Sequence, residues 1–414
     1  MGVDKKPHNV DVSCDEKQVV GGDFGGCRPK KFRGNDVAIK KMKDVDASET
    51  SMEEFVKEIG MLDKLQTLLV NKNSLSTLPV EIGNLRSLYE LDLSTNQMDK
   101  LPEELGQLLS LKTLRIGYNK LSGEIDVLTN FKFLVELDLQ NNPGIVQLPN
   151  IGGLVNLTRL VVRSLPIFEI PGLDLLTALN ELNIRDNARM TGIPETIYSI
   201  TSLQRLDIVA CNVSKIPAAI STIQNLNFLV LSNNNINETS FDESFTTLTN
   251  ITKLNVSHNQ LHAIPEVLCQ LTGIIELDLT NNMLVTLPDS IAQMTNVQQL
   301  SISNNRINVL PLALGDLVSV TYIDAKNNQL KQLPETIGQL RQLVRLDLTQ
   351  NMIPALPVEL ANLIDNLMYL DLTNNPLVVP PKEIVSKGTR EICKYLKDNE
   401  TVIKGKTISG LGVD

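Results

Sequence analysis

The sequence predicts an α/β solenoid, a horseshoe with a parallel concave sheet and helical caps at both ends. Three observations predict this fold. A pattern rich in leucine recurs along most of the 414 residues. The apolar fraction of 42% is almost entirely aliphatic, since aromatic residues are only 4% and tryptophan is absent, which favours many thin, similar layers. Segments with helical spacing of apolar residues flank the array on both sides.

The repeating unit has the form LxxLxLxxN, as in the run Leu88, Leu91, Leu93 and Asn96. Positions equivalent to this asparagine are 73, 96, 119, 142, 165, 187, 211, 234, 259, 282, 305, 328, 351 and 375. The sequence therefore contains fourteen repeats, with gaps of 22 to 25 residues. Asparagine occupies twelve of the fourteen positions, and Leu165 and Cys211 are the exceptions.

Each repeat predicts one short strand followed by a polar corner. Alternation places Leu91 and Leu93 inward and Asp92 outward, as a strand requires. The asparagine amide then satisfies backbone groups that the turn would otherwise leave buried and unpaired. Asparagines of successive layers should form a ladder, which we expect to be weakest at Leu165 because leucine forms no hydrogen bond.

Most repeats continue with a Leu-Pro or Ile-Pro pair, and proline suits the first position of a short helical turn. The repeats around Ile125 and Thr239 lack this proline, so we expect irregular convex segments there. Both ends of a solenoid need a lid. A capping box at Ser51 to Glu54 opens one candidate helix, and Pro380 to Leu396 supplies the other.

The predicted organisation has four parts. Residues 1–50 are mostly disordered, 51–64 form an N-terminal capping helix, 65–379 form the repeat domain, and 380–414 form the C-terminal cap and tail.

Composition and motifs exclude several functions. The formal net charge of −10 argues against nucleic acid and anionic membranes as partners. Five scattered cysteines, with no signal peptide and no apolar run long enough to span a bilayer, predict a cytoplasmic protein. The three histidines (His8, His258 and His262) do not form a metal site, and no nucleophile or phosphate-binding motif occurs. We therefore expect no cofactor, no metal and no enzymatic activity.

The 23-residue LxxLxLxxNxLxxLP units of residues 65–379 resemble the intracellular Ras-group class of leucine-rich-repeat proteins, and Pro380 to Leu396 resembles the end-cap of that class. The resemblance implies a leucine-rich-repeat horseshoe and a scaffold for small GTPases or serine/threonine phosphatases. Other members of the class carry a kinase or phosphatase domain in the same chain.

Residues 20–65 resemble part of the small lobe of a tyrosine-kinase-like protein kinase. On this resemblance, Lys40 stands at the phosphate-binding lysine and Glu58 at its helix partner. No catalytic loop or metal-binding motif follows before the repeats begin, and phosphoryl transfer requires both. The fragment is therefore interpreted as degenerate, without catalysis or cofactor binding.

The outward strand residues form the concave face, about 60 Å long for fourteen strands at about 4.8 Å spacing. Such a face suits a protein partner better than a small molecule. Arg163 and Arg185 fall at equivalent positions of adjacent repeats, which favours an acidic or phosphorylated ligand group, although pairing with Asp186 or Asp207 is the alternative. We expect exposed apolar residues beside them, as at the centre of a protein interface. The predicted partner-binding residues are Arg159, Val161, Arg163, Arg185, Arg205, Val209, Phe228 and Val230.

Four aspartates, Asp278, Asp324, Asp347 and Asp371, share one row of the C-terminal half. They predict either a basic partner or a requirement of the repeat itself. The leading hypothesis is a monomeric, non-catalytic scaffold or adaptor in intracellular signalling. Alternatives are the targeting region of a kinase or phosphatase whose catalytic domain this chain lacks, and a phosphoinositide-binding module.

Overall fold

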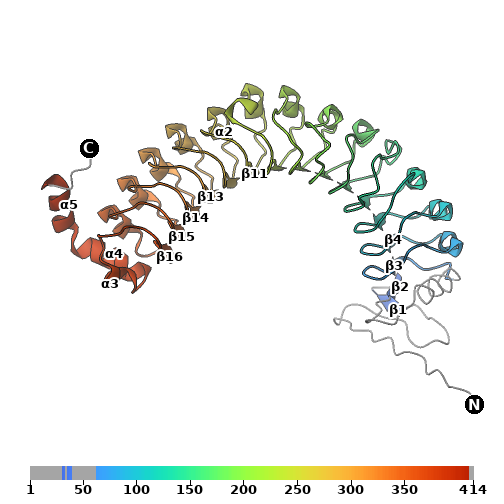
Figure 1. Ribbon diagram of the computed structural model, residues 1–414, viewed down its shortest axis with the longest axis horizontal. Coiled ribbons are helices and arrows are strands. Elements are labelled where there is room, and N and C mark those ends of the chain that lie inside the picture. Colours follow the sequence, from blue (N-terminus) through green and yellow to red (C-terminus); the bar gives the residue numbers. More distant parts are fainter. Residues whose placement is uncertain (1–29, 33–34, 40–61, 410–414) are drawn as a thin grey trace, which may run out of the picture. The chain divides into compact units, whose positions relative to one another are not determined.

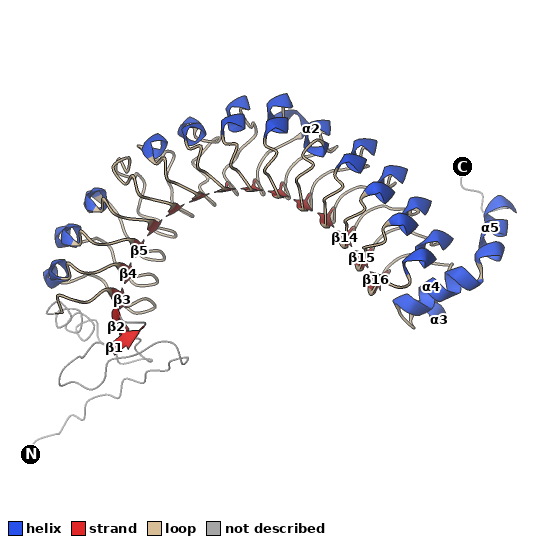
Figure 2. Cartoon of the chain, turned by 180° about the vertical axis from the view of Figure 1, so that it is seen from behind, coloured by secondary structure: helices blue, strands red, loops and turns tan. Residues whose placement is uncertain are grey.

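The computed structural model describes residues 30–32, 35–39 and 62–409 (Figure 1). The chain divides into two compact units, Met1–Leu203 and Gln204–Asp414. Within each unit the strands line the inner side of a curved coil, and short helical turns line its outer side (Figure 2).

In the first unit, consecutive strands pair in chain order, and all pairs except β1 with β2 are parallel. The strands are β1 (Lys30–Phe32), β2 (Asn35–Ile39), β3 (Thr67–Leu69), β4 (Glu90–Asp92), β5 (Thr113–Arg115), β6 (Glu136–Asp138), β7 (Arg159–Val161) and β8 (Glu181–Asn183). The outer turns are the 3₁₀ helices η1 (Val80–Asn84), η2 (Glu103–Gln107), η3 (Asp126–Asn130), η4 (Leu173–Leu175) and η5 (Glu195–Ser199).

In the second unit, every pair of consecutive strands is parallel. The strands are β9 (Arg205–Asp207), β10 (Phe228–Val230), β11 (Lys253–Asn255), β12 (Glu276–Asp278), β13 (Gln299–Ser301), β14 (Tyr322–Asp324), β15 (Arg345–Asp347) and β16 (Tyr369–Asp371). The outer turns are η6 (Ala218–Thr222), η7 (Glu238–Ser240), η8 (Glu243–Thr247), α2 (Glu266–Cys269), η9 (Asp289–Gln293), η10 (Leu312–Asp316), η11 (Glu335–Gln339) and η12 (Val358–Leu363).

The predicted solenoid is confirmed, because the strands from β3 to β8 and from β9 to β16 correspond one to one with the fourteen repeats. The strand leucines are fully buried in each layer, as Leu91 and Leu93 illustrate. One layer cannot bury such an edge alone, so the stacking of neighbours provides most of the stability.

The asparagine ladder forms as the sequence predicts. The Oδ1 atom of Asn96 accepts the N–H of Leu75 in the preceding repeat at 3.0 Å, and its Nδ2 atom donates to the carbonyls of Val70 and Leu93 at 3.0 and 2.9 Å. Each asparagine thus satisfies buried backbone groups of two repeats. At Cys211 the thiol donates to the carbonyl of Val209, two residues earlier, at 3.3 Å.

The two repeats without the proline behave differently. The turn that follows Ile125 is a five-residue 3₁₀ helix like its neighbours, so the expected irregularity is wrong there. The longest repeat is irregular as expected, because two short helices, η7 and η8, replace one turn. Asn237 caps the first of them, and the Phe241 and Phe245 rings pack edge to face at 5.2 Å.

The two ends of the array are closed in different ways. At the C-terminal end, α3 (Lys382–Val385), α4 (Thr389–Asp398) and α5 (Glu400–Ser409) follow the last repeat, and α4 buries Ile392, Cys393 and Leu396. At the N-terminal end, β2 pairs with β3 in parallel register, from Val37 opposite Thr67 to Ile39 opposite Leu69. The predicted capping helix at 51–64 lies almost wholly outside the described residues.

Candidate protein-binding surface

The strand residues that point outward form rows across each unit. The row six residues before the asparagine position contains the first residue of every repeat strand, and the row four residues before it contains the last. Direct strand pairing places members of one row opposite one another, so neighbours in a row interact most strongly.

In the first unit, these rows form a continuous ladder of ion pairs over five strands. Arg115 contacts Glu90 at 2.7 Å and Glu136 at 3.0 Å. Arg159 contacts Glu136 at 2.7 Å and Glu181 at 3.2 Å. Burial opposes the charged form of Arg115, but hydrogen bonds and charges from Glu136 and Glu90 outweigh it and raise the pKa of its guanidinium. The ladder therefore holds Arg159 in place by structural ion pairs.

Arg163 and Arg185 lie in neighbouring repeats of this unit, two residues beyond the ends of β7 and β8. Arg163 forms an ion pair with Asp186, with an Nε–Oδ2 distance of 2.9 Å. Of the two interpretations, an acidic ligand or an internal ion pair, the structure therefore contains the ion pair of Arg163 with Asp186. Both arginines are only partly exposed.

The expectation of exposed apolar residues beside the arginines is wrong for the three valines. Val161, Val209 and Val230 are all buried in the sheet. Phe228 alone among the predicted apolar residues is exposed. In the second unit, the Arg205 guanidinium lies 5.8 Å from the centre of the Phe228 ring and 3.1 Å from an Asp207 carboxylate oxygen.

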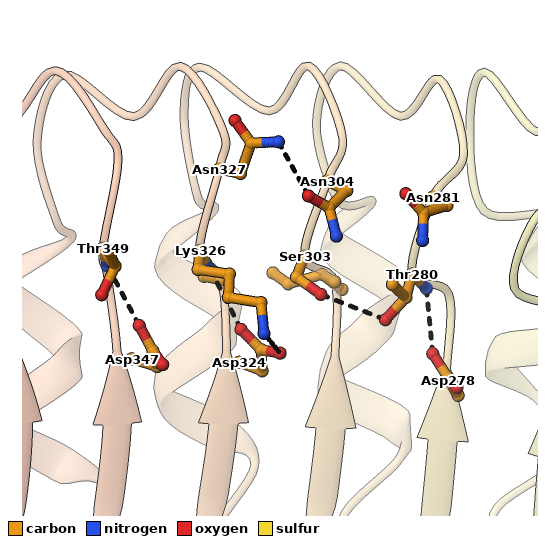
Figure 3. A network of polar contacts seen from close by, with 12 residues as sticks. Asp278, Thr280, Asn281, Ser303, Asn304, Asp324, Lys326, Asn327, Asp347 and Thr349 are labelled. Carbon is orange, nitrogen blue, oxygen red and sulfur yellow. Dashed lines mark hydrogen bonds and ion pairs between the residues drawn. The ribbon is translucent and has the colours of Figure 1, made fainter.

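Four aspartates of the second unit share a structural role, and Figure 3 shows three of them, Asp278, Asp324 and Asp347. An Oδ1 atom of Asp278, Asp324, Asp347 and Asp371 accepts the backbone N–H of the residue two positions later, at 3.0, 3.2, 3.1 and 3.0 Å. In the first unit, Asp92 and Asp138 form the same bond. The residue three positions after each aspartate has a positive φ, so the carboxylate supports a sharp turn. The interpretation as a requirement of the repeat is therefore favoured.

A cluster that the sequence analysis missed lies on the last three strands of the second unit. Tyr322, Arg345 and Tyr369 are opposite one another on β14, β15 and β16. The Arg345 guanidinium lies 5.4 Å from the Tyr322 ring centre and 4.4 Å from that of Tyr369. Reading the first outward row to its end would have found this cluster, because the three residues stand six positions before asparagines 328, 351 and 375.

Two aspartates lie beside this cluster. The hydroxyl of Tyr369 donates to an Asp371 carboxylate oxygen at 2.9 Å. Burial tends to raise the pKa of Asp371, but hydrogen bonds from Thr373 and Tyr369 outweigh it and lower this pKa. Asp347 is buried between Asp324 and Asp371 in the same register. The cluster thus combines exposed aromatic surface with a row of carboxylates.

The remaining candidates form no metal site in the part of the chain that the structure describes. Among these residues, no group of three or more histidine, cysteine or acidic side chains could hold a metal ion. His258 contacts Asn281, and His262 lies 3.7 Å from Glu238. Lys40 and Glu58 lie outside the described residues. No helix within the described ranges is long and apolar enough to cross a membrane.

Comparisons with known proteins agree with the repeat pattern. The leucine-rich-repeat family models match residues 250–271 and 273–330. A solved leucine-rich-repeat protein of Leptospira interrogans is 33% identical, with a TM-score of 0.78, over 85% of this chain and 87% of that one. The plant peptide hormone receptor RGFR1, solved in complex with RGF2, is 30% identical with a TM-score of 0.61, over 78% of this chain and 53% of that one.

Among curated proteins, the human volume-regulated anion channel subunit LRRC8B is 29% identical over 122 residues. The match covers 29% of this chain and only 15% of that protein. The similarity thus covers only a small part of the length of this curated relative.

Proposed function

Because this chain belongs to the leucine-rich-repeat family, we propose that it is a non-catalytic scaffold that binds a protein partner on the concave strand face of its second unit. The observation that carries the proposal is the cluster of Tyr322, Arg345 and Tyr369. Tyrosine and arginine are enriched among the residues that dominate binding energy at protein interfaces.

The geometry of the cluster favours binding because little conformational freedom remains to be lost. The two rings hold the Arg345 guanidinium from both neighbouring strands, and the hydroxyl of Tyr369 is fixed by Asp371. A side chain that is already ordered loses less entropy when a partner covers it. The partly exposed carboxylate of Asp371 lies next to the cluster and favours a partner with basic groups at its contact surface.

Arg205 and Phe228 supply a second anchor in the same unit. Phe228 is an exposed ring beside a cation, which is a frequent combination at interface centres. Arg163 and Arg185 of the first unit, together with Arg159, remain proposed contacts. The ion pairs of Arg159 and Arg163 reduce the support for a phosphoinositide as the main ligand, since a phosphate would have to displace carboxylates.

The partner class that we propose is a small GTPase or serine/threonine phosphatase of an intracellular signalling pathway. The support is the resemblance of the 23-residue units to the Ras-group repeats. Cys211, Cys269 and Cys393 are buried free thiols, which agrees with the proposed cytoplasmic location. A targeting region for a kinase or phosphatase remains the second candidate. In both cases the chain itself should show no phosphotransfer above a Lys40→Ala control.

Affinity capture from cell lysate with quantitative mass spectrometry tests the proposal. The bait variant combines Arg345→Gln with Tyr369→Ala. The matched control combines Arg306→Gln with Tyr118→Ala, which changes the same residue types at other exposed positions. We expect proteins captured by the wild-type chain to be lost with the first variant and retained with the control. Retention of all partners by the first variant would place the binding surface elsewhere.

A further inference from the structure

A strip of exposed apolar side chains follows the turns that lead into β4, β5, β6 and β7 of the first unit. Tyr89, Leu109, Phe133 and Val155 are 49%, 61%, 59% and 53% exposed. We call these four residues, together with Lys112 and Lys132, the turn strip. It lies at the start of the strands, whereas the aspartate row lies at their ends, so it is a different surface from the one proposed above.

Backbone hydrogen bonds show that the turns are direct neighbours. The N–H of Lys112 donates to the carbonyl of Tyr89 at 2.9 Å, and the N–H of Val135 donates to that of Lys112 at 2.8 Å. The side-chain amide of Asn156 donates to the carbonyl of Lys132 at 2.8 Å. Four turns at a strand spacing of about 4.8 Å extend over about 15 Å, which is the length of about ten residues of α-helix.

The other repeats show that the fold does not require these apolar residues. Phe133 occupies the position at which Asn156, Asn250 and Asn296 each donate to a carbonyl of the preceding repeat, at 2.8, 2.8 and 2.9 Å. A phenylalanine there loses this hydrogen bond and leaves its ring mostly in water. Leu109 likewise occupies the position of Thr249, Thr272 and Thr295. Folding alone gives no reason for either substitution.

The charge around the strip has one sign. The Lys112 ammonium lies 5.1 Å from the Tyr89 ring centre. The Lys132 ammonium lies over Gly153, two residues before Val155, in the space that a side chain at position 153 would occupy. The four turn segments, residues 84–89, 107–112, 130–135 and 153–158, contain no aspartate or glutamate. The nearest strand carboxylates, Glu90 and Glu136, are both paired with Arg115.

We propose that the turn strip docks an acidic, amphipathic segment of a second protein partner. Apolar side chains of that segment cover Leu109 and Phe133, and its carboxylates pair with Lys112 and Lys132. Charge complementarity identifies this occupant, because the strip offers cations and apolar surface without any carboxylate. The net charge of −10 disfavours an anionic bilayer as the occupant, since the rest of the chain would be repelled.

The test uses the full chain and peptides selected from a phage-displayed random library of about 16-residue segments, long enough to exceed the strip. The strip variant combines Leu109→Thr with Phe133→Asn, which restores residues that other repeats carry at these positions. A charge variant combines Lys112→Glu with Lys132→Glu. The control is Val318→Thr, which changes an exposed apolar residue at the position equivalent to Leu109 in the second unit. Circular dichroism should show equal melting temperatures for the strip variant and the wild-type chain.

We expect the wild-type chain to enrich peptides that combine glutamate or aspartate with leucine or phenylalanine at helical spacing. Fluorescence anisotropy should show a Kd at least tenfold higher for the strip and charge variants and an unchanged Kd for Val318→Thr. The effect of the charge variant should shrink at high salt. If the enriched peptides bound the strip variant as tightly as the wild-type chain, the proposal would be overturned. The proposal would also be overturned if no acidic peptide were enriched and the wild-type chain, but not the strip variant, sedimented with phosphatidylserine vesicles. Neither result affects the concave-face proposal, which depends on Arg345 and Tyr369.

Discussion

The guanidinium carbon of Arg345 lies 4.4 Å from the ring centre of Tyr369, its partner on the adjacent strand. A cation this close to an aromatic face is attracted by the ring quadrupole, by about 0.5–1 kcal/mol where both groups are solvent-exposed. The contact also fixes the orientation of a long side chain that would otherwise sample many rotamers. We therefore expect the contact to matter more for the entropy cost of the proposed binding than for the stability of the repeat array.

The first prediction separates these two contributions. Arg345→Gln should lower the free energy of unfolding by no more than about 1 kcal/mol, because only exposed contacts are lost. Affinity for the captured partner should fall at least tenfold, or about 1.4 kcal/mol, because the anchor is removed. Urea unfolding and titration calorimetry on the same preparation provide both values. A loss of stability equal to the loss of affinity would show that the residue acts through folding.

A second prediction concerns the asparagine ladder. Asn305 accepts the N–H of Leu284 at 3.1 Å and donates to the carbonyls of Leu279 and Ile302 at 3.1 and 3.0 Å. Asn305→Ala should lower the free energy of unfolding by about 3 kcal/mol, since each buried backbone group left without a partner costs about 1–3 kcal/mol. The exposed Asn308 in the same repeat is the control, and Asn308→Ala should change stability by less than about 0.5 kcal/mol. Equal effects in denaturant unfolding would rule out the ladder as the cause.

The buried carboxylate of Asp138 gives a third prediction, on pH dependence. Burial raises its pKa, even though hydrogen bonds from Gln140 and the charge of Arg159 act in the opposite direction. A carboxyl whose pKa is higher in the folded than in the unfolded state binds its proton more readily when folded. Its contribution to stability is therefore unfavourable at neutral pH and improves as the pH falls through the folded pKa.

Asp138→Asn should accordingly raise the melting temperature at pH 7, and the advantage should shrink as the pH approaches 4. The asparagine Oδ1 can still accept the backbone N–H of Gln140, which the aspartate accepts at 3.0 Å. Melting curves at several pH values, compared with the wild-type chain, measure the difference. An advantage that grows towards acid pH would contradict the assignment of burial as the dominant cause.

A fourth prediction addresses the ion-pair ladder of the first unit. Arg115→Gln leaves Glu90 and Glu136 facing one another across β5 without the cation between them. We expect a loss of about 1 kcal/mol at low ionic strength, because a partly exposed network is worth slightly more than an isolated surface pair. The loss should decrease in 1 M salt, where the Debye length is about 3 Å. The exposed Arg86→Gln should be neutral, and a salt-independent loss at Arg115 would indicate a packing effect instead.

The fifth prediction concerns the N-terminal edge. Because β2 pairs with β3 along three register positions, removing residues 1–45 exposes the edge of β3. The melting temperature should fall, since damage in a solenoid begins at an open end and propagates through neighbours. Removing residues 1–29 leaves β1 and β2 in place and should have little effect. Identical melting curves for both truncations would show that β2 does not protect the edge of β3.

The repeat architecture could be predicted from the sequence because its determinants are local and repeated. Inward leucines, the corner asparagine and the outer proline each act within one repeat or between neighbours, so their spacing fixes strand, turn and ladder. The same locality explains why the strand pairing at the N-terminal end of the array could not be predicted. The parallel pairing of β2 with β3 joins segments separated by 27 residues, from Ile39 to Thr67, and no local pattern specifies it.

The binding surface was harder to predict because it depends on which side chains the neighbouring strands leave uncovered. The row positions of Val161, Val209 and Val230 are those of outward residues, but lateral packing buries all three. The ion-pair partner of Arg163 lies 23 positions away in the sequence. The two tyrosines that contact Arg345 are separated from it by about the same number of residues, one before it and one after it.

The sequence by itself therefore determined the number of repeats, the strand positions, the asparagine ladder and the outward rows, since each follows from periodicity. Only the tertiary structure decided which outward residues are exposed and which charges are paired. Those properties arise between repeats, from the lengths and conformations of side chains that happen to face one another. The contacts between repeats bury the three valines and allow the aspartates to support turns, and they leave Arg345 and the apolar residues of the turn strip exposed.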